Sequence, residues 1–308
     1  MARVFVTREL PGSGVDRLSE AGHEVDLWPD PAPPPRDALV ERLRGAEGLL
    51  CMLTDPVDAE LIESAPDLKA IANYAVGTDN IDLEAATRRG IPVGNTPDVL
   101  TETTADLAFG LMLAAARRLV EADRYVRAGE WGEWAPDLLL GHDLYGATLG
   151  IVGYGRIGKA VGRRAAGFDM DVIHGIPLEE LLERSDFVSL HAPLTPETRG
   201  LIGATELARM KPTAILVNTA RGPLVDTAAL ADALNAGEIA GAGLDVTDPE
   251  PLPADHPLLR APGLVVAPHI GSASHRTREA MVDMAVGNLL AALAGERMPH
   301  CANPDVYG

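Results

Sequence analysis

The chain has 308 residues, of which 46% are hydrophobic and 23% are charged. This composition excludes extensive disorder, and the length favours two domains of ordinary size. A net charge of −19, from 26 basic and 45 acidic residues, disfavours nucleic acids and anionic membranes as partners. The longest apolar run, residues 107–116, is too short to cross a bilayer and no secretory leader is recognisable, so we expect a cytoplasmic protein.

In the first hundred residues, short β-branched runs alternate with amphipathic stretches. This alternation is typical of βα units that build a parallel sheet. The expected strands lie at residues 4–6, 25–28 and 49–53, and the expected helices lie at 15–21, 36–44 and 59–65.

A threonine-rich segment at 95–104 offers an N-cap to a long helical pattern over 105–128, and a second alternating series then begins. Its expected strands lie at 148–152, 172–174, 187–190, 214–218, 241–245 and 264–267. A last helical pattern, 277–294, would return the chain to the first domain. We therefore predict one domain formed by residues 1–98 and 286–308, interrupted by a second domain at 99–285.

The expected strand at 148–152 leads directly into Gly153-Tyr-Gly-Arg-Ile-Gly158, and a helical pattern follows. Gly153 would allow the tight turn, Gly155 would let a pyrophosphate approach the backbone, and Gly158 would let the helix pack on the strand. The N-terminus of that helix would attract the phosphates. This setting predicts dinucleotide binding, with an ordinary glycine turn as the alternative. No spacing of His or Cys residues suggests a metal site.

Three chemically capable side chains, Arg221, Glu250 and His269, each follow an expected strand. The carboxyl ends of strands in such a sheet form the edge where ligands bind. An arginine there would bind a carboxylate, a histidine would act as general acid or base, and a glutamate would hold the imidazole. The alternative is a surface arginine and a loop carboxylate without a role.

Five segments together resemble the D-isomer-specific 2-hydroxyacid dehydrogenases, and most of all the glyoxylate/hydroxypyruvate reductases among them. They read VGTDNID, GIVGYGRIGKAV, NTARGPLVD, GLDVTDPEPLP and APHIGSASHRTREAM. The resemblance implies a two-domain α/β protein with parallel sheets, in which a Rossmann-like cofactor domain is inserted into a flavodoxin-like substrate domain. It also implies NAD or NADP as cofactor, no metal, a small anionic 2-keto acid as substrate, and a homodimer.

The resemblance also assigns roles to single residues. Arg221 would bind the carboxylate and keto oxygen of the substrate, His269 would protonate that oxygen, and Glu250 would hold His269. Further substrate contacts would come from Leu53, Val76, Gly77, Trp134 and Ser272. The dinucleotide would be lined by Thr104, Gly153, Gly155, Arg156, Ile157, Gly158, His191, Ala192, Pro193, Thr198, Thr219, Ala220, Asp245 and Gly271. For Trp134, the alternatives are contact with a neighbouring subunit's substrate cleft and plain packing.

One departure from the family pattern follows the expected strand at 172–174. That strand should end near a residue that reads the adenosine ribose, acidic for NAD or basic for NADP. Here Gly175-Ile-Pro177 runs straight into a helical stretch at 178–184, so a helix and short strand typical of the family are missing. Glu179 and Glu180 are better explained as a solvated helix face than as substitutes. The preference between the two cofactors therefore stays open.

The leading hypothesis is an NAD(P)H-dependent reductase of glyoxylate or hydroxypyruvate. Within the same class, a phosphoglycerate-type or other D-hydroxyacid dehydrogenase is the alternative. From a different class, the alternative is a dinucleotide-sensing binding protein like the corepressors of the family, since such relatives can keep the same polar residues.

Overall fold

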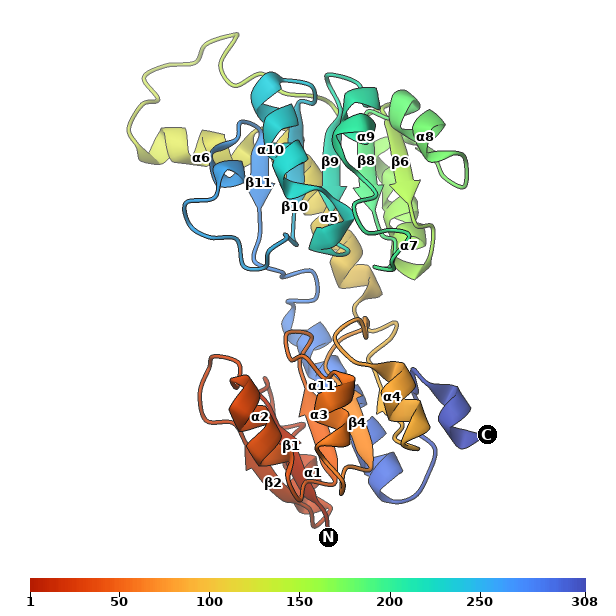
Figure 1. The fold of residues 1–308 in the computed structure, drawn as a ribbon. Coiled ribbons are helices and arrows are strands. Elements are labelled where there is room, and N and C mark those ends of the chain that lie inside the picture. Colours follow the sequence, from red (N-terminus) through yellow and green to blue (C-terminus); the bar gives the residue numbers. More distant parts are fainter. The chain divides into compact units, whose positions relative to one another are not determined.

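The structure, a computed structural model, describes all 308 residues and divides them into two compact units (Figure 1). Unit 1 contains Met1–Leu100 and Ala273–Gly308, and unit 2 contains Thr101–Ser272. Each unit is built on one sheet whose neighbouring strands are all parallel. The predicted α/β class with parallel sheets is confirmed. None of the helices combines the length and the apolarity needed to span a membrane.

The sheet of unit 1 has the strand order β2-β1-β3-β4-β5, which is that of flavodoxin-like folds. The elements of unit 1 are β1 (Arg3–Val6), α1 (Asp16–Glu20), β2 (Glu24–Leu27), α2 (Arg36–Leu43), β3 (Gly48–Cys51), α3 (Ala59–Glu63), β4 (Ala70–Asn73), α4 (Leu83–Arg88), β5 (Val93–Gly94), α11 (His275–Leu293) and the short 3-10 helix η4 (Pro304–Tyr307).

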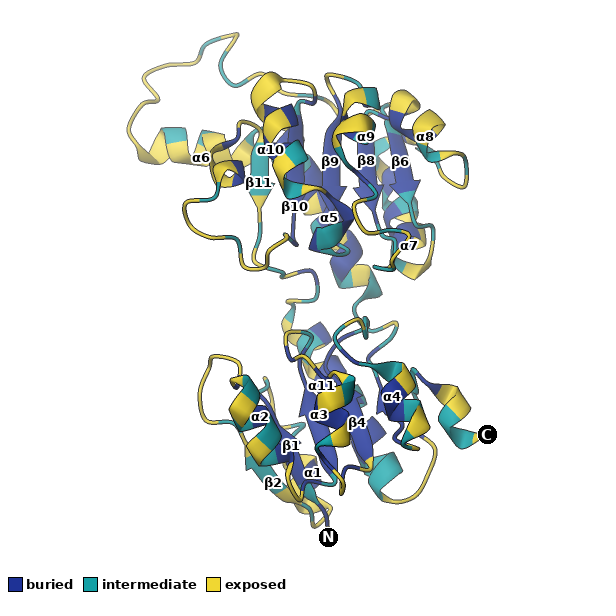
Figure 2. Ribbon diagram, in the orientation of Figure 1, coloured by how far each residue is buried: buried dark blue, intermediate teal, exposed yellow.

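Both faces of this sheet are covered at its centre, which explains why β3 and β4 are almost continuous apolar runs. Phe5, Leu49 and Ile71 belong to a core shared with α2, α3 and α4. The alternate residues Val4 and Leu50 belong to a second core, shared with α1 and α11. The central strands β3 and β4 are buried, the edge strand β2 is partly exposed, and the outer surfaces of the helices are exposed (Figure 2).

Helix α11 belongs wholly to unit 1. Met281 and Val282, in its first half, are buried in the same core as Val4 and Leu50. The sequence-based boundary at residue 285 falls inside this helix, whereas the structural division follows Ser272. The difference arises because the apolar face of one helix is continuous and packs as a single body.

In unit 2 the strand order is β11-β10-β9-β8-β6-β7, and the order of strand addition reverses at β6. Ligands of open parallel sheets bind at such a switch point. The elements of unit 2 are α5 (Thr101–Ala116), α6 (Leu119–Arg127), β6 (Thr148–Val152), α7 (Arg156–Ala165), η1 (Ala166–Phe168), β7 (Asp171–Ile173), α8 (Leu178–Arg184), β8 (Phe187–Leu190), α9 (Ala204–Arg209), β9 (Ile215–Asn218), η2 (Gly222–Leu224), α10 (Thr227–Ala236), β10 (Gly241–Leu244), η3 (Pro257–Arg260) and β11 (Leu264–Val266).

The single helix predicted over 105–128 is wrong, because the chain breaks it into α5 and α6. Arg118 has a φ of 51°, in the left-handed region. The carbonyl of Ala116 accepts a hydrogen bond from the amide of His142 at 2.9 Å. A methyl group at Gly141 would lie 2.2 Å from that same oxygen, so a distant segment packs closely on the end of α5. This tertiary contact replaces the next helical hydrogen bond.

Strand β7 forms one edge of the unit 2 sheet, and only residues 174–177 separate it from α8. Strands β7 and β8 pair with opposite sides of β6, since Leu149 is opposite Val172 on one side and Phe187 on the other. The short connection expected from the sequence is therefore long enough to close the sheet.

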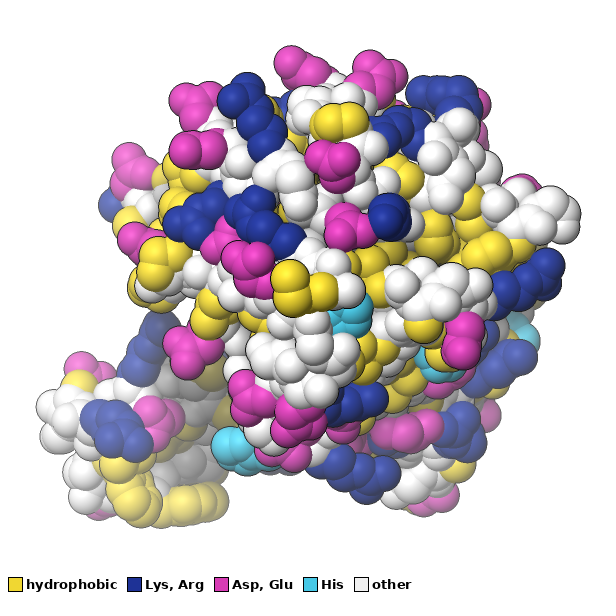
Figure 3. Space-filling model, turned by 90° about the horizontal axis from the view of Figure 1, so that it is seen from below, with side chains coloured by type: hydrophobic (Ala, Val, Ile, Leu, Met, Phe, Trp, Pro, Cys, Tyr) yellow, Lys and Arg dark blue, Asp and Glu magenta, His cyan; other side chains and the backbone are white.

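Charged side chains of both signs are interspersed on the face shown in Figure 3. Many are paired locally. Arg3 lies 2.6 Å from Asp26 in unit 1, and in unit 2 Arg164 lies 2.9 Å from Glu102. Surface pairs of this kind contribute about 0–1 kcal/mol each. They offset part of the self-repulsion of an acidic chain without determining its fold.

Candidate active site

His269 and Glu250 follow neighbouring strands of unit 2, β11 and β10, and the structure brings them together. The Nδ1 atom of His269 lies 2.6 Å from Oε1 of Glu250. The second carboxylate oxygen of Glu250 accepts a hydrogen bond from the amide of Thr247 at 3.3 Å. Since Nδ1 is engaged in this way, Nε2 is the imidazole nitrogen that can act on a ligand.

Glu250 is charged in this setting. Its partial burial raises the pKa of the carboxyl group, but the hydrogen bond and the charge of His269 act in the opposite direction, as does the charge of Arg221. The pKa of Glu250 ends below its ordinary value. The site therefore places a carboxylate against an imidazole, with an arginine nearby.

The backbone at His269 is shaped by Asp245, which follows β10. His269 has a φ of 54°, an uncommon conformation for a residue with a side chain, and its amide donates to the carbonyl of Asp245 at 2.8 Å. The Asp245 carboxylate accepts hydrogen bonds from the backbone amides of Ile270 and Gly271, both at 2.7 Å. Burial raises the pKa of Asp245, and these two amides oppose that shift. Asp245 thus fixes the turn that presents His269.

Arg221 follows β9 on a loop that the buried Asn218 holds. The Asn218 side chain donates to the carbonyl of Arg221 at 2.8 Å and accepts the amide of Ala220 at 3.0 Å. A methyl group at Gly222 would lie 1.9 Å from the carbonyl oxygen of Thr247. The loop that carries Arg221 is therefore in close contact with the loop that leads to Glu250.

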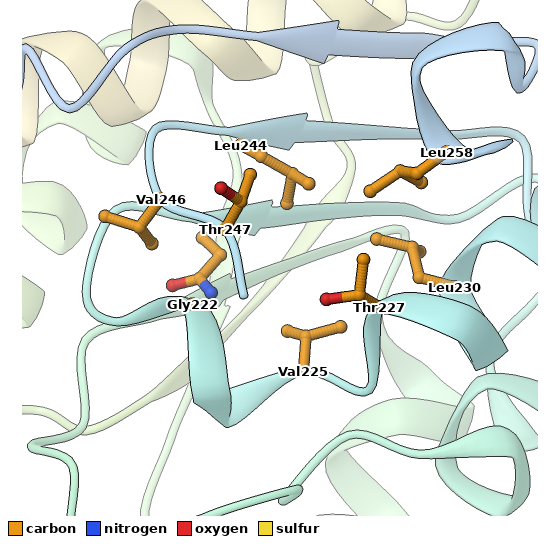
Figure 4. A pocket seen from close by; sticks show the side chains of 9 residues that line it. Gly222, Val225, Thr227, Leu230, Leu244, Val246, Thr247 and Leu258 are labelled. Atoms are coloured by element: carbon orange, nitrogen blue, oxygen red, sulfur yellow. The ribbon is translucent and has the colours of Figure 1, made fainter. Parts of the chain in front are cut away.

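A small cavity of about 10 Å³ lies behind these two loops (Figure 4). Its volume is about that of one water molecule, and most of the side chains that surround it are apolar. The residues that line it are Asn218, Gly222, Val225, Thr227, Leu230, Leu244, Val246, Thr247 and Leu258. It is a packing gap beside the Arg221 loop and is too small for a substrate.

The glycine-rich turn has the geometry that a dinucleotide needs. Gly153 has a φ of 91°, and a methyl group there would lie 2.5 Å from the amide nitrogen of Ala192. A methyl group at Gly158 would lie 2.3 Å from the carbonyl oxygen of Gly153. Gly155, just before α7, faces open space, and no acidic residue lies in the first turn of α7. An anionic pyrophosphate can thus approach the N-terminus of this helix.

Two buried polar atoms near this turn lack a partner within the protein. The Nε2 atom of His191 lies 2.8 Å from the hydroxyl of Ser189, whereas Nδ1 of His191 has no partner. The Thr219 hydroxyl is also buried and unpartnered. Burial lowers the pKa of His191 to about 4, so its imidazole is neutral. Unsatisfied groups at the ends of β8 and β9 fit a polar ligand lying across the sheet edge.

The other residues predicted for the site are distributed over both units. All positions predicted to line the dinucleotide lie in unit 2, as do Trp134 and Ser272. Leu53, Val76 and Gly77 lie in unit 1, after the ends of β3 and β4. Trp134 is 79% exposed, so it is not packed in the core of its own chain. Thr198 supports the loop after β8, because its hydroxyl donates to the carbonyl of Pro193 at 2.7 Å.

Sequence comparisons relate this chain to known dehydrogenases and reductases. The profile of the NAD-binding domain of D-isomer-specific 2-hydroxyacid dehydrogenases matches residues 109–271. A glyoxylate reductase of Korarchaeum cryptofilum is 55% identical, with 99% of this chain and 96% of that protein covered. One from Thermococcus litoralis is 51% identical, with 99% and 97% covered.

Solved structures agree. A protein of Thermus thermophilus superimposes with a TM-score of 0.94 at 53% identity, covering 97% of this chain and 99% of that one. An NADPH-dependent glyoxylate/hydroxypyruvate reductase of Sinorhizobium meliloti, in complex with NADP and malonate, gives 0.85 at 34% identity, covering 98% and 96%. The chain belongs to the D-isomer-specific 2-hydroxyacid dehydrogenase family. It is an oxidoreductase that uses a nicotinamide dinucleotide to reduce keto acids, and the resemblance seen in its motifs is confirmed.

Sequence reasoning did not single out three asparagines that shape the site loops. Asn218 holds the Arg221 loop, as described above. In unit 1, Asn73 and Asn80 connect the loops that carry Leu53 and Gly77. The available signal was the position of Asn73 and Asn218, each the last residue of a buried strand, where a buried amide side chain must find partners in the adjoining loops.

Proposed function

We propose that the protein reduces glyoxylate or hydroxypyruvate to the corresponding 2-hydroxy acid, with His269 as general acid. The observation that carries this proposal is the 2.6 Å contact between His269 Nδ1 and Glu250 Oε1, close to Arg221 at the ligand-binding edge of the unit 2 sheet. Bound reduced nicotinamide would supply a hydride.

Within this proposal, the Arg221 guanidinium binds the carboxylate and the keto oxygen of the substrate and so polarises the carbonyl. His269 donates its proton from Nε2 to the keto oxygen as the oxygen gains charge. Glu250 keeps the imidazole oriented through its contact with Nδ1. The amides of Val76 and Gly77 provide a second set of donors to the carboxylate, and Leu53 contributes an apolar contact.

For the cofactor, we propose that NADH and NADPH are both used and are poorly discriminated. The four residues that connect β7 to α8 include no acidic side chain to accept the ribose hydroxyls. Glu180 is engaged with Arg184 at 2.6 Å, and Glu179 with Arg209 at 3.5 Å. The alignment with the Korarchaeum relative spans 321 positions, so that relative carries residues that this chain lacks.

We also propose a cytoplasmic homodimer formed through unit 2. Helix α6 buries none of its residues, and the loop after it exposes further large apolar side chains. These exposed residues are Leu119, Val120, Val126, Trp131, Trp134, Leu140 and Tyr145. A monomer seldom exposes so many large apolar side chains on one stretch, so a second copy of the chain would cover them. In that dimer Trp134 would contact the partner's substrate site, as the family resemblance implies.

A rate assay tests the function. Glyoxylate, hydroxypyruvate, pyruvate and 3-phosphohydroxypyruvate are each offered with NADH and with NADPH. We expect glyoxylate and hydroxypyruvate to give the highest kcat/KM, and His269→Ala to lower kcat by about 10²–10⁴-fold while cofactor binding is retained. A preference for 3-phosphohydroxypyruvate would contradict the substrate assignment. Cofactor binding without turnover of any keto acid would favour a dinucleotide-sensing protein.

A further inference from the structure

The segment that carries Val76 and Gly77 has three successive carbonyl groups that each accept a hydrogen bond. The carbonyl of Ala75 accepts the amide of Thr96 at 2.9 Å. The carbonyl of Val76 accepts a hydrogen bond from Nδ2 of Asn95 at 2.8 Å. The carbonyl of Gly77 accepts one from Nδ2 of Asn73, also at 2.8 Å.

Holding these carbonyls also orients the amides of the next residues. A trans peptide is planar, and its C=O and N–H point in opposite directions. The two cis peptides of the chain lie elsewhere, before Pro249 and Pro251. The amides of Val76, Gly77 and Thr78 therefore point away from the groups that hold the carbonyls. None of the three amides donates to a backbone carbonyl, so each of these successive N–H groups stays able to donate to an anion.

Asn80 connects this segment to the loop that carries Leu53. Its Nδ2 donates to the carbonyls of Met52 and Asp55, each at 3.0 Å, and its Oδ1 accepts Nδ2 of Asn73 at 2.9 Å. Both amide hydrogens and the oxygen of Asn80 are thus used. Asn73 is fully buried, so it cannot turn toward solvent in exchange for these partners.

We propose that Asn73, Asn80 and Asn95 are positioning residues that fix the amides of Val76 and Gly77, together with that of Thr78, for the carboxylate of the substrate. This proposal rests on the proposed function, since it concerns the same substrate. The three side chains act through the backbone and do not touch the substrate. Thr78 adds an amide donor that the family resemblance did not assign.

The test uses Asn95→Asp and Asn80→Asp, which keep the shape of the side chain and replace its donor by an acceptor that repels the carbonyl it faces. Asn235→Asp is the matched control, because Asn235 is exposed on α10 and donates only to the carbonyl of Ala231 in the same helix. Steady-state kinetics with glyoxylate, competitive inhibition by oxamate, and the dissociation constant of NADH are measured for each variant.

We expect both site variants to raise the KM for glyoxylate and the inhibition constant of oxamate by about tenfold or more, with NADH binding unchanged. The control should match the wild type. A purely structural role would remove active enzyme and lower the apparent kcat without moving KM, and this result would overturn the proposal. Wild-type values of both constants in both variants would overturn it as well.

Hydrogen exchange of the peptide that contains residues 74–80 separates this proposal from the proposed function. We expect faster exchange at Tyr74, whose amide donates to the carbonyl of Cys51 at 2.8 Å, in both variants than in the wild type and the control. If the wild type reduces no 2-keto acid, the proposed function fails, and the exchange rate alone decides whether the asparagines hold this segment. Unchanged exchange would show that they do not.

Discussion

The Oδ2 atom of Asp245 accepts the amide of Gly271 at 2.7 Å, and a methyl group at Gly271 would lie 3.0 Å from that same oxygen. The carboxylate and the glycine are thus fitted to each other, and the left-handed conformation of His269 lies directly before this contact. The position of the proposed general acid therefore depends on Asp245, which directly follows the neighbouring strand β10.

Asp245→Asn should disturb this turn. An amide has one acceptor oxygen, so its NH₂ group must face one of the two backbone donors that the carboxylate now accepts. We expect the free energy of unfolding to fall by about 1–3 kcal/mol, and kcat to fall in the folded enzyme. Denaturant titration and steady-state kinetics measure the two effects. Asp232→Asn, on the exposed side of α10, serves as control, and wild-type behaviour of Asp245→Asn would contradict the proposed support of His269.

Glu250→Gln should move the pH profile of keto acid reduction toward acid. The low pKa of Glu250 keeps a carboxylate beside the imidazole at neutral pH, and that charge favours the protonated form needed for reduction. Glutamine keeps the shape and removes the charge, so the proton is lost at a lower pH and the rate falls earlier as the pH rises. The profile of kcat/KM from about pH 5 to 9 measures this. A profile that keeps the wild-type position would argue against the pairing.

Arg221→Lys should impair binding and turnover together. The backbone contacts of Asn218 with this loop do not involve the guanidinium, so the loop should keep its path. An ammonium cannot reproduce the planar fork that holds carboxylate and keto oxygen at once. We expect a KM for glyoxylate raised by about tenfold or more and a lower kcat. Arg209→Lys, at the surface of α9, is the control. A fully active Arg221→Lys enzyme would reduce the role of Arg221 to a local positive charge.

The short connection at 174–177 should weaken the discrimination between NADH and NADPH. Without a side chain on the ribose, affinity should be lower by about 1.5–3 kcal/mol, the contribution of a hydrogen bond to a charged group. We expect the two dissociation constants, measured by fluorescence titration, to differ by less than about a hundredfold, or ~2.7 kcal/mol. A larger preference would show that another residue reads the ribose.

The elements with a strong local signal were predictable. An apolar run such as 4–6 became a buried central strand, because a strand covered on both faces needs no polar residue. The glycine turn at 153–158 was predictable because a side chain at any of its three glycines would obstruct the turn, the approach of a pyrophosphate or the packing of the helix. The family and the parallel α/β fold followed from these features and are confirmed, whereas the roles of Arg221, Glu250 and His269 stay predictions.

What the sequence could not supply depends on contacts between distant segments. The break after Ala116 arises from Gly141 and His142, and the two arginines at the break carry no signal of their own. The asparagine network of unit 1 depends on Asn73, Asn80 and Asn95 meeting carbonyls of other loops, and an isolated asparagine has no pattern that predicts such partners.

Strand β7 has an unpaired side, and this affects solubility. A free strand edge offers its N–H and C=O groups to any other chain that can extend the sheet, which is a route to aggregation. Strand β7 limits this hazard in two ways: it is only three residues long, and it begins with the exposed charge of Asp171. Lengthening β7, or replacing Asp171 by an apolar residue, would create a template for intermolecular pairing that the present chain lacks.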